Sequence, residues 1–193
     1  MSEIAARYRT RADIFAAKVA AVRPDQWSNP SPCTEWTARD VVGHIVEMHG
    51  AMLYPLGRSL SPARTVEEDP LAAFASARAD VEALLADPAA AASGVDSPAG
   101  HVTTEQHIDQ VVSADMVLHG WDLARATGQD DTIDPAELAA MWPGVQQIPD
   151  ELRIPGAVRP GVVVFGPKVE VPDDAPLQHR VLGLLGRDPH WSA

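Results

Sequence analysis

Residues 113–128 have the sequence SADMVLHGWDLARATG, which predicts a helix with an acid and an imidazole on its buried face. At about 100° per residue, as in an α-helix, its apolar side chains share one face with those just before it. These residues are Ile108, Val112, Met116, Leu123 and Ala126. His119 lies near the middle of that face, and Asp115 lies one turn earlier. Because an isolated buried carboxylate is costly, Asp115 needs a partner, a cation or a site open to water.

Three other segments have the same helical periodicity. The spacing of Thr37 and Asp40 approximates a capping box, and Asp69 followed by Pro70 is typical of a helix start. The last helix should end at Gly128, because glycine readily adopts the left-handed backbone conformation that commonly ends a helix. The segments between the helices are loops rich in small residues, proline and serine, one with a short extended piece near residue 101. The four expected helices cover about residues 3–22, 37–54, 69–87 and 104–127, which predicts a four-helix bundle.

The character of the chain changes after residue 128. We expect a domain at residues 1–128, which is the bundle with its site, and a short appendage at residues 129–193 that packs on it. The appendage should contain a short helix after Asp134, a strand or hairpin in GVVVFGPKVEVP (161–172) and a final helix in DAPLQHRVLGLLG (174–186). The fold class is therefore mainly all-α.

Charge and composition exclude several classes of partner. The net charge of -12 repels phosphate backbones and anionic lipids, so we expect neither a nucleic-acid nor a membrane partner. The first residues contain scattered charges and resemble neither a secretory signal nor a membrane span. The single cysteine, Cys33, agrees with a reducing compartment, and we expect a cytoplasmic protein. Exposed apolar helix faces would allow a homodimer.

A second imidazole faces the expected bundle interior. His44 shares the inward face of its helix with Val41, Ile45 and Met48. A helical pair such as Asp115 and His119, four residues apart, brings two ligands to one metal, and His44 would supply the third. Three protein ligands leave an open position, as in catalytic sites. Imidazole and carboxylate ligands suit Zn²⁺ and also Fe²⁺, Ni²⁺ or Mn²⁺.

The same pattern has a simpler interpretation, in which these side chains are hydrogen-bonded core residues without a metal. Asp122, three residues after His119, is either a rival ligand or an anchor for an imidazole N–H. Glu47 and His49 flank the inward stripe and should be solvated or at the rim. Cys33 should have a structural role. The expected role of Trp36, Trp121 and Trp142 is packing, with Trp121 beside the site.

Three segments resemble a known family in the same order along the chain. They are PSPCTEWTARDVVGHIVE (30–47), VLHGWDLARATGQD (117–130) and FGPKVEVPDDAPLQHRVLGLLGRDP (165–189). They resemble actinobacterial-type proteins of the DinB-like superfamily, and in particular the metal-binding domain of mycothiol-dependent maleylpyruvate isomerase. The resemblance implies that a metal triad falls on His44, Asp115 and His119. Where the isomerase has glutamate, this sequence has the shorter Asp115, which would alter the choice or affinity of the metal.

The resemblance implies a divalent-metal-dependent thiol transferase or isomerase. Its cosubstrate would be mycothiol or a similar low-molecular-weight thiol, and the thiolate would attack a small electrophile. Two alternatives remain open. One is a metal-assisted hydrolase, with Glu47 as the nearby general base. The other is a non-catalytic metal-binding module. Turnover that depends on a thiol separates the first function from both alternatives.

Overall fold

The computed structural model describes residues 2–97, 100–156 and 163–192. The chain divides into two compact units, Met1–Asp131 and Thr132–Ala193. The first unit contains every residue of the expected metal triad.

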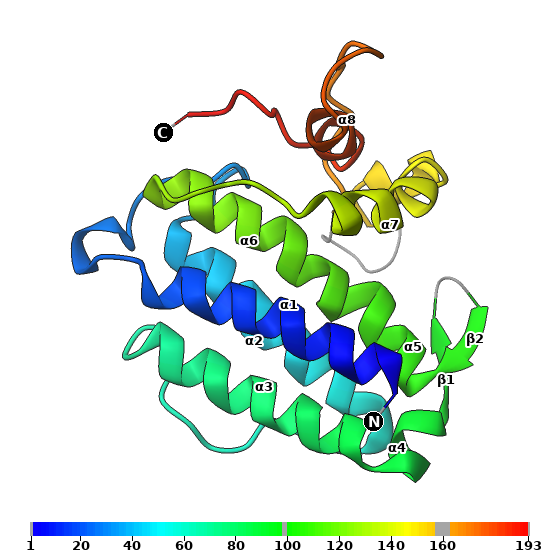
Figure 1. The fold of residues 1–193 in the computed structure, drawn as a ribbon. Coiled ribbons are helices and arrows are strands. Elements are labelled where there is room, and N and C mark those ends of the chain that lie inside the picture. Colours follow the sequence, from blue (N-terminus) through cyan, green and yellow to red (C-terminus); the bar gives the residue numbers. More distant parts are fainter. Residues whose placement is uncertain (1, 98–99, 157–162, 193) are drawn as a thin grey trace. The chain divides into compact units, whose positions relative to one another are not determined.

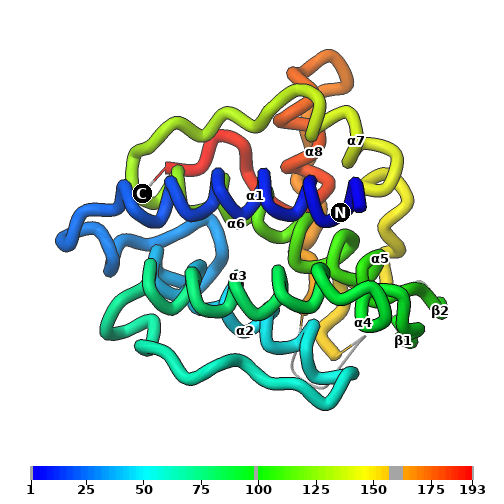
Figure 2. Tube along the Cα trace, turned by 60° about the horizontal axis from the view of Figure 1, so that its bottom comes forward, coloured from blue at the N-terminus to red at the C-terminus, as the bar shows by residue number. Residues whose placement is uncertain are grey.

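The first unit is a four-helix bundle. It consists of α1 (Glu3–Ala20), α2 (Ala38–Leu53), α3 (Pro70–Ala86) and α6 (Ala114–Thr127). Helices α1 and α2 each pack against both α3 and α6, so α2 and α6 are direct neighbours (Figures 1 and 2). The predicted mainly helical fold is thereby confirmed, and the neighbouring pair contains the three expected ligands.

Side-chain caps define the helix starts that the sequence predicts. Thr37 Oγ1 accepts a hydrogen bond from the Asp40 N–H, and Asp40 Oδ2 accepts one from the Thr37 N–H, which completes the capping box of α2. Asp69 caps α3, with Pro70 at its first position. Helix α6 ends at Gly128, whose backbone is left-handed (φ 68°), as expected for a C-terminal glycine.

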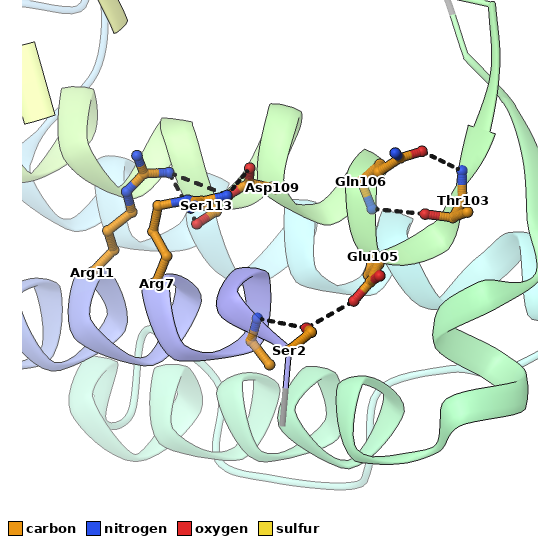
Figure 3. A network of polar contacts seen from close by, with 9 residues as sticks. Ser2, Arg7, Arg11, Thr103, Glu105, Gln106, Asp109 and Ser113 are labelled. Atoms are coloured by element: carbon orange, nitrogen blue, oxygen red, sulfur yellow. Dashed lines mark hydrogen bonds and ion pairs between the residues drawn. The ribbon is translucent and has the colours of Figure 1, made fainter. Parts of the chain in front are cut away.

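The fourth helical segment is not a single regular α-helix. It begins as α5 (Thr104–Ile108), passes through a π-helical turn (Asp109–Ser113) and continues as α6. Arg7 on α1 donates two hydrogen bonds to the Asp109 carboxylate, at 2.9 and 2.6 Å, and Arg11 donates one to Ser113 Oγ at 3.2 Å (Figure 3). The π-helical turn ends at Ser113, two residues before Asp115. Such π-bulges within α-helices occur frequently near functional sites.

The bundle core is apolar and continuous. It includes Phe15, Ile45, Phe74 and Leu123, all fully buried. The five apolar residues predicted to share a face with His119 are buried as well. Burial of such side chains stabilises the bundle by about 1.5–3 kcal/mol for each large apolar side chain.

The segment between α3 and α5 is more ordered than the expected loop. It forms the short helix α4 (Pro88–Ala92) and an antiparallel hairpin, β1 (Gly94–Ser97) with β2 (Gly100–Thr103), in which Asp96 pairs with His101. Asp87 caps α4 by accepting hydrogen bonds from the N–H groups of residues 89 and 90. The extended piece expected near residue 101 is therefore one strand of this hairpin.

The second unit contains α7 (Pro135–Val145), a 3₁₀ turn (Asp150–Arg153) and α8 (Leu177–Leu184), with α7 packed against α8. Asp134 caps α7, as predicted. The described residues 163–172 contain no strand, and residues 161–162 of the expected strand or hairpin lie outside the described ranges. Within the part of the chain that the structure describes, no helix combines the length and apolarity needed to span a membrane.

Candidate metal centre

The structure brings His44, Asp115 and His119 together between α2 and α6. His44 Nε2 lies 3.4 Å from Asp115 Oδ2, and the two imidazole rings lie 4.7 Å apart between centroids in an edge-on arrangement. Each residue offers one ligand atom, and these atoms all lie within 4.8 Å of one another. Residues separated by more than 70 positions in the chain thus meet at one point.

The donor set and its spacing fit a divalent cation. In a tetrahedral zinc site, the usual bond lengths place a nitrogen and an oxygen ligand about 3.4 Å apart. The distance between His44 Nε2 and Asp115 Oδ2 has this value. The side chains of His44 and Asp115 are 25% and 29% exposed, so the site is open to solvent on their side. An exchangeable fourth ligand could therefore enter.

Asp122 orients the His119 ring. His119 Nδ1 donates a hydrogen bond to Asp122 Oδ2 at 2.9 Å, and the Asp122 side chain is fully buried. With the proton on Nδ1, the lone pair of the neutral imidazole lies on Nε2, which is the atom left for a metal. This carboxylate–imidazole pair matches the anchor that metal-ligating histidines usually have.

Trp36 stacks on the His119 ring and makes a tilted contact with His44. Its ring lies 5.7 Å from that of His119 at an interplanar angle of 29°, and 4.9 Å from that of His44 at 42°. Trp121 was the tryptophan expected beside the site, and only packing was expected of Trp36. In the structure, Trp36 contacts both imidazole rings. Its position immediately before the N-cap of the His44 helix was the available signal in the sequence.

A second group of metal-ligand side chains lies on the other nitrogen of His119. Cys33 Sγ lies 3.2 Å from Asp122 Oδ2 and 3.9 Å from His119 Nδ1. Cys33, His119 and Asp122 form a group whose ligand atoms also lie within 4.8 Å of one another. A structural role was predicted for Cys33 because no base adjoins it in the sequence, and His119, which does lie near it in the structure, comes 86 residues later.

A cavity of about 340 Å³ adjoins His44. Its lining residues include the carboxylates of Glu35, Asp40, Glu47 and Glu67, together with Arg39. The Arg39 guanidinium donates hydrogen bonds to the backbone carbonyls of residues 66 and 67 and forms an ion pair with the Glu67 carboxylate. The electrostatic environment of the cavity is therefore predominantly negative.

The backbone of Glu35 is left-handed (φ 68°). Non-glycine residues adopt this conformation rarely, and such backbone strain is often found at functional sites. Glu35 stands between Cys33 and Trp36 in the loop that covers the two imidazoles. Glu47, the candidate base of a hydrolase, lines the cavity with His44.

His49 does not lie at the rim as predicted. It is fully buried, with Nδ1 donating to the Ile45 carbonyl at 2.6 Å and Nε2 accepting from the Tyr8 hydroxyl at 2.7 Å. Burial lowers the pKa of His49 to about 4. This neutral histidine belongs to the core and has no part in the candidate site.

The chain is similar in sequence to known proteins. The profile of the mycothiol maleylpyruvate isomerase N-terminal domain matches residues 8–126. Two relatives from Mycobacterium tuberculosis, the uncharacterized proteins MT0763 of strain CDC 1551 and Rv0738 of strain H37Rv, are each 37% identical to the chain over 130 residues. These alignments cover 66% of this chain and 68% of each relative. No solved structure gives a significant match.

The family match covers α2 and α6 together with all three residues of the candidate site, and it covers more than half of the chain. The helical bundle is the architecture expected of the DinB-like superfamily. This chain therefore belongs to the mycothiol maleylpyruvate isomerase N-terminal domain family.

Proposed function

We propose that this protein is a divalent-metal-dependent thiol transferase or isomerase that uses mycothiol or a similar low-molecular-weight thiol. His44, Asp115 and His119 would hold the metal, with Zn²⁺ favoured by the donor set and Fe²⁺, Ni²⁺ or Mn²⁺ as alternatives. The observation that carries the proposal is the hydrogen bond from His119 Nδ1 to the buried Asp122. It leaves Nε2 as the ligand atom in a group that already contains His44 and Asp115.

Two neutral imidazoles and one carboxylate leave a net positive charge on a bound divalent ion, which lowers the pKa of a thiol at its open position. Asp122 keeps the proton on Nδ1 of His119 and so holds the ring in one tautomer. Trp36 covers one face of the His119 ring and limits the access of water from its side. The side chains of His44 and Asp115 are partly exposed, so a thiol can approach the metal position from their side.

The chemistry balances without a redox partner. The thiol gives its proton to solvent, its sulfur forms a bond to an electrophilic carbon, and the displaced electron pair moves onto the electrophile. In an isomerase, the sulfur leaves again after rotation about the carbon–carbon bond and the thiol is regenerated. In a transferase, the carbon–sulfur bond remains, and the electron pair on the electrophile takes up a proton from solvent.

The cavity beside His44 indicates the charge of the substrate. Four carboxylates line it, and its one arginine is engaged by backbone carbonyls and by Glu67. Negative charge around a binding site repels anionic ligands. We therefore favour a neutral or cationic electrophile over a dicarboxylate.

Metal content tests the proposal first. Elemental analysis of protein loaded with Mn²⁺, an ion that prefers nitrogen and oxygen ligands, should give about one ion per chain, and His44→Ala and His119→Ala should each lose it. His101→Ala is the matched control, because this histidine lies on the exposed hairpin outside the site. Retention of metal by both site variants would refute the proposed ligands.

Turnover tests the reaction. Consumption of a small neutral electrophile should require both thiol and metal, and His44→Ala should abolish it while His101→Ala leaves it unchanged. A metal-loaded protein that neither binds thiols nor consumes electrophiles would be the non-catalytic module instead.

One observation favours a second candidate, a metal-assisted hydrolase. Glu47 lines the same cavity as His44, where a carboxylate can act as a general base. Ester hydrolysis that proceeds without thiol and falls in Glu47→Gln would support this alternative. Dependence of all turnover on added thiol would exclude it.

A further inference from the structure

Cys33, His119 and Asp122 form a compact group of three metal-ligand side chains on the inner side of the candidate metal centre. Asp122 Oδ2 lies 3.2 Å from Cys33 Sγ and 2.9 Å from His119 Nδ1, and 3.9 Å separates the sulfur from that nitrogen. The group is more buried than the three residues around His44. Cys33 is 9% exposed and Asp122 is fully buried.

These distances are close to those of a thiolate-containing zinc site. Zinc binds sulfur at about 2.3 Å and nitrogen or oxygen at about 2.0–2.2 Å, which places tetrahedral ligands about 3.4–3.6 Å apart. The three observed distances each depart from those values by about 0.5 Å or less. Small side-chain rotations are enough to accommodate a cation.

The charges of the group suit a buried divalent cation. A thiolate from Cys33 and the carboxylate of Asp122 together balance two positive charges, so the occupied site is electrically neutral. Neutrality matters at this position, because a net charge in a buried environment has a high desolvation penalty. The more exposed group around His44 supplies only one carboxylate and leaves a bound divalent ion with net positive charge.

The loop that contains Cys33 is held against the end of α6. Gln26 and Asn29 each donate a side-chain hydrogen bond to the last carbonyls of that helix, at residues 127 and 126. Within the loop, the Ser31 N–H donates to the Trp36 carbonyl, and the Cys33 N–H donates to Ser31 Oγ. The position of the sulfur beside Asp122 is therefore defined by several hydrogen bonds.

We propose that Cys33, His119 and Asp122 form a second cation site, specific for thiophilic divalent ions, which competes with the site at His44 for the same imidazole. A neutral imidazole has one lone pair, so His119 serves one site through Nδ1 or the other through Nε2. The thiolate makes the inner site favour soft ions such as Cd²⁺, whereas the outer site has only nitrogen and oxygen ligands and also accepts harder ions such as Mn²⁺. Zn²⁺ suits the ligands of either site. The competition rests on the proposed function, whereas the inner site itself does not.

Occupation of the inner site rearranges two protons. The Cys33 thiol releases its proton to solvent when the sulfur binds the cation. The proton on His119 Nδ1 is replaced by one on Nε2, so the ring remains neutral. The hydrogen bonds to Asp122 Oδ2 from the sulfur and from Nδ1 give way to metal–ligand bonds.

Cobalt substitution tests the inner site directly. The full chain contains one cysteine, so any thiolate-to-cobalt charge-transfer absorption arises from Cys33. Metal-free protein, reduced with a phosphine and titrated with Co²⁺ alone, should show this absorption in the near ultraviolet. The band should persist in His44→Ala and be lost in Cys33→Ser. The affinity for Cd²⁺ should fall at least about tenfold in Cys33→Ser, because a soft ligand is replaced by a hard one.

The outcomes separate this inference from the proposed function. If wild-type protein and His44→Ala bind Co²⁺ without a thiolate band, the inner site is refuted. If the wild type binds one Co²⁺ without the band and His44→Ala loses it, the outer site stands and the inner site falls. A band that survives in His44→Ala and Asp115→Ala supports the inner site, and Mn²⁺ binding that is unchanged in both variants would refute the outer one.

Folding of the variants is checked by circular dichroism and by the urea midpoint. Cys33→Ser retains the size and shape of the side chain, so it is the most reliable variant of the series. A second variant, Cys33→Ala, should lose the band in the same way. A band that remains in both folded variants would overturn the assignment of the sulfur ligand.

Discussion

Removal of one hydroxyl from the bundle core should measurably destabilise the protein. Tyr8 and His49 are both fully buried, and the Tyr8 hydroxyl donates to His49 Nε2 at 2.7 Å. His49 Nδ1 is occupied by the Ile45 carbonyl, so Tyr8→Phe leaves Nε2 as a buried acceptor without its donor. An unsatisfied buried polar group costs about 1–3 kcal/mol. We expect Tyr8→Phe to lower the free energy of unfolding by this amount at pH 7.

The effect should depend on pH. Burial raises the pKa of the Tyr8 hydroxyl, which therefore remains protonated as a donor, and burial lowers the pKa of His49 from 6.5 to about 4. Between pH 6.5 and about 4, the unfolded chain binds a proton at residue 49 that the folded chain does not. Neutral His49 therefore makes its full contribution to the free energy of unfolding above pH 6.5. This contribution, about 3 kcal/mol, is lost as the pH falls toward 4.

Tyr8→Phe removes a donor that favours neutral His49, so the variant should lose less stability on acidification than the wild type. The difference between the two proteins should therefore be largest at pH 7 and smaller near pH 4.5. Urea unfolding followed by circular dichroism at both pH values measures it. Tyr54→Phe is the matched control, because that side chain is 81% exposed and should change little. Equal stability of Tyr8→Phe and wild type at pH 7 would refute the reasoning.

Three other changes give further checks. Asp122→Asn should weaken metal binding about 10–100-fold without loss of helix content, because it changes the anchor of the His119 ring; competition with a chromophoric chelator measures this, and an unchanged affinity would contradict the role. Thr37→Ala should lower the free energy of unfolding by about 1 kcal/mol through loss of the α2 cap; chemical denaturation tests it. At low salt, cysteamine should bind the cobalt-loaded protein about tenfold more tightly than mercaptosuccinate. Glu47→Gln should reduce the ratio of the two thiol affinities, because it removes one of the carboxylates that line the cavity.

Local patterns in the sequence were sufficient to predict the helices of the bundle. The start of α2 at Thr37, the start of α3 after Asp69 and the end of α6 at Gly128 all depend on residues within a few positions of the boundary. Such short-range hydrogen bonds and backbone preferences can be recognised in one sequence. The π-turn of residues 109–113 could not, because arginines about 100 positions away on α1 bind it.

Helical spacing also identified His44, Asp115 and His119 as candidates, since each shares a face with apolar residues. Only the packing of α2 against α6 brings the three side chains within ligand distance of one another. The same spacing misplaced His49, because the pattern of one helix does not show that Tyr8 on another helix can satisfy a buried imidazole.

Capping and periodicity are local properties, so the sequence alone was sufficient to place the starts of α2 and α3 and the end of α6. It also placed His44 and His119 on inward faces, but it did not do so for His49. The stacking of Trp36 on His119 and the position of Cys33 beside Asp122 depend on the tertiary structure alone. These contacts join a loop to a helix more than 80 residues later, and the hydrogen bonds of Gln26 and Asn29 to the end of α6 hold that part of the chain against the helix. No periodicity encodes such a contact, because it depends on how separate segments pack in space.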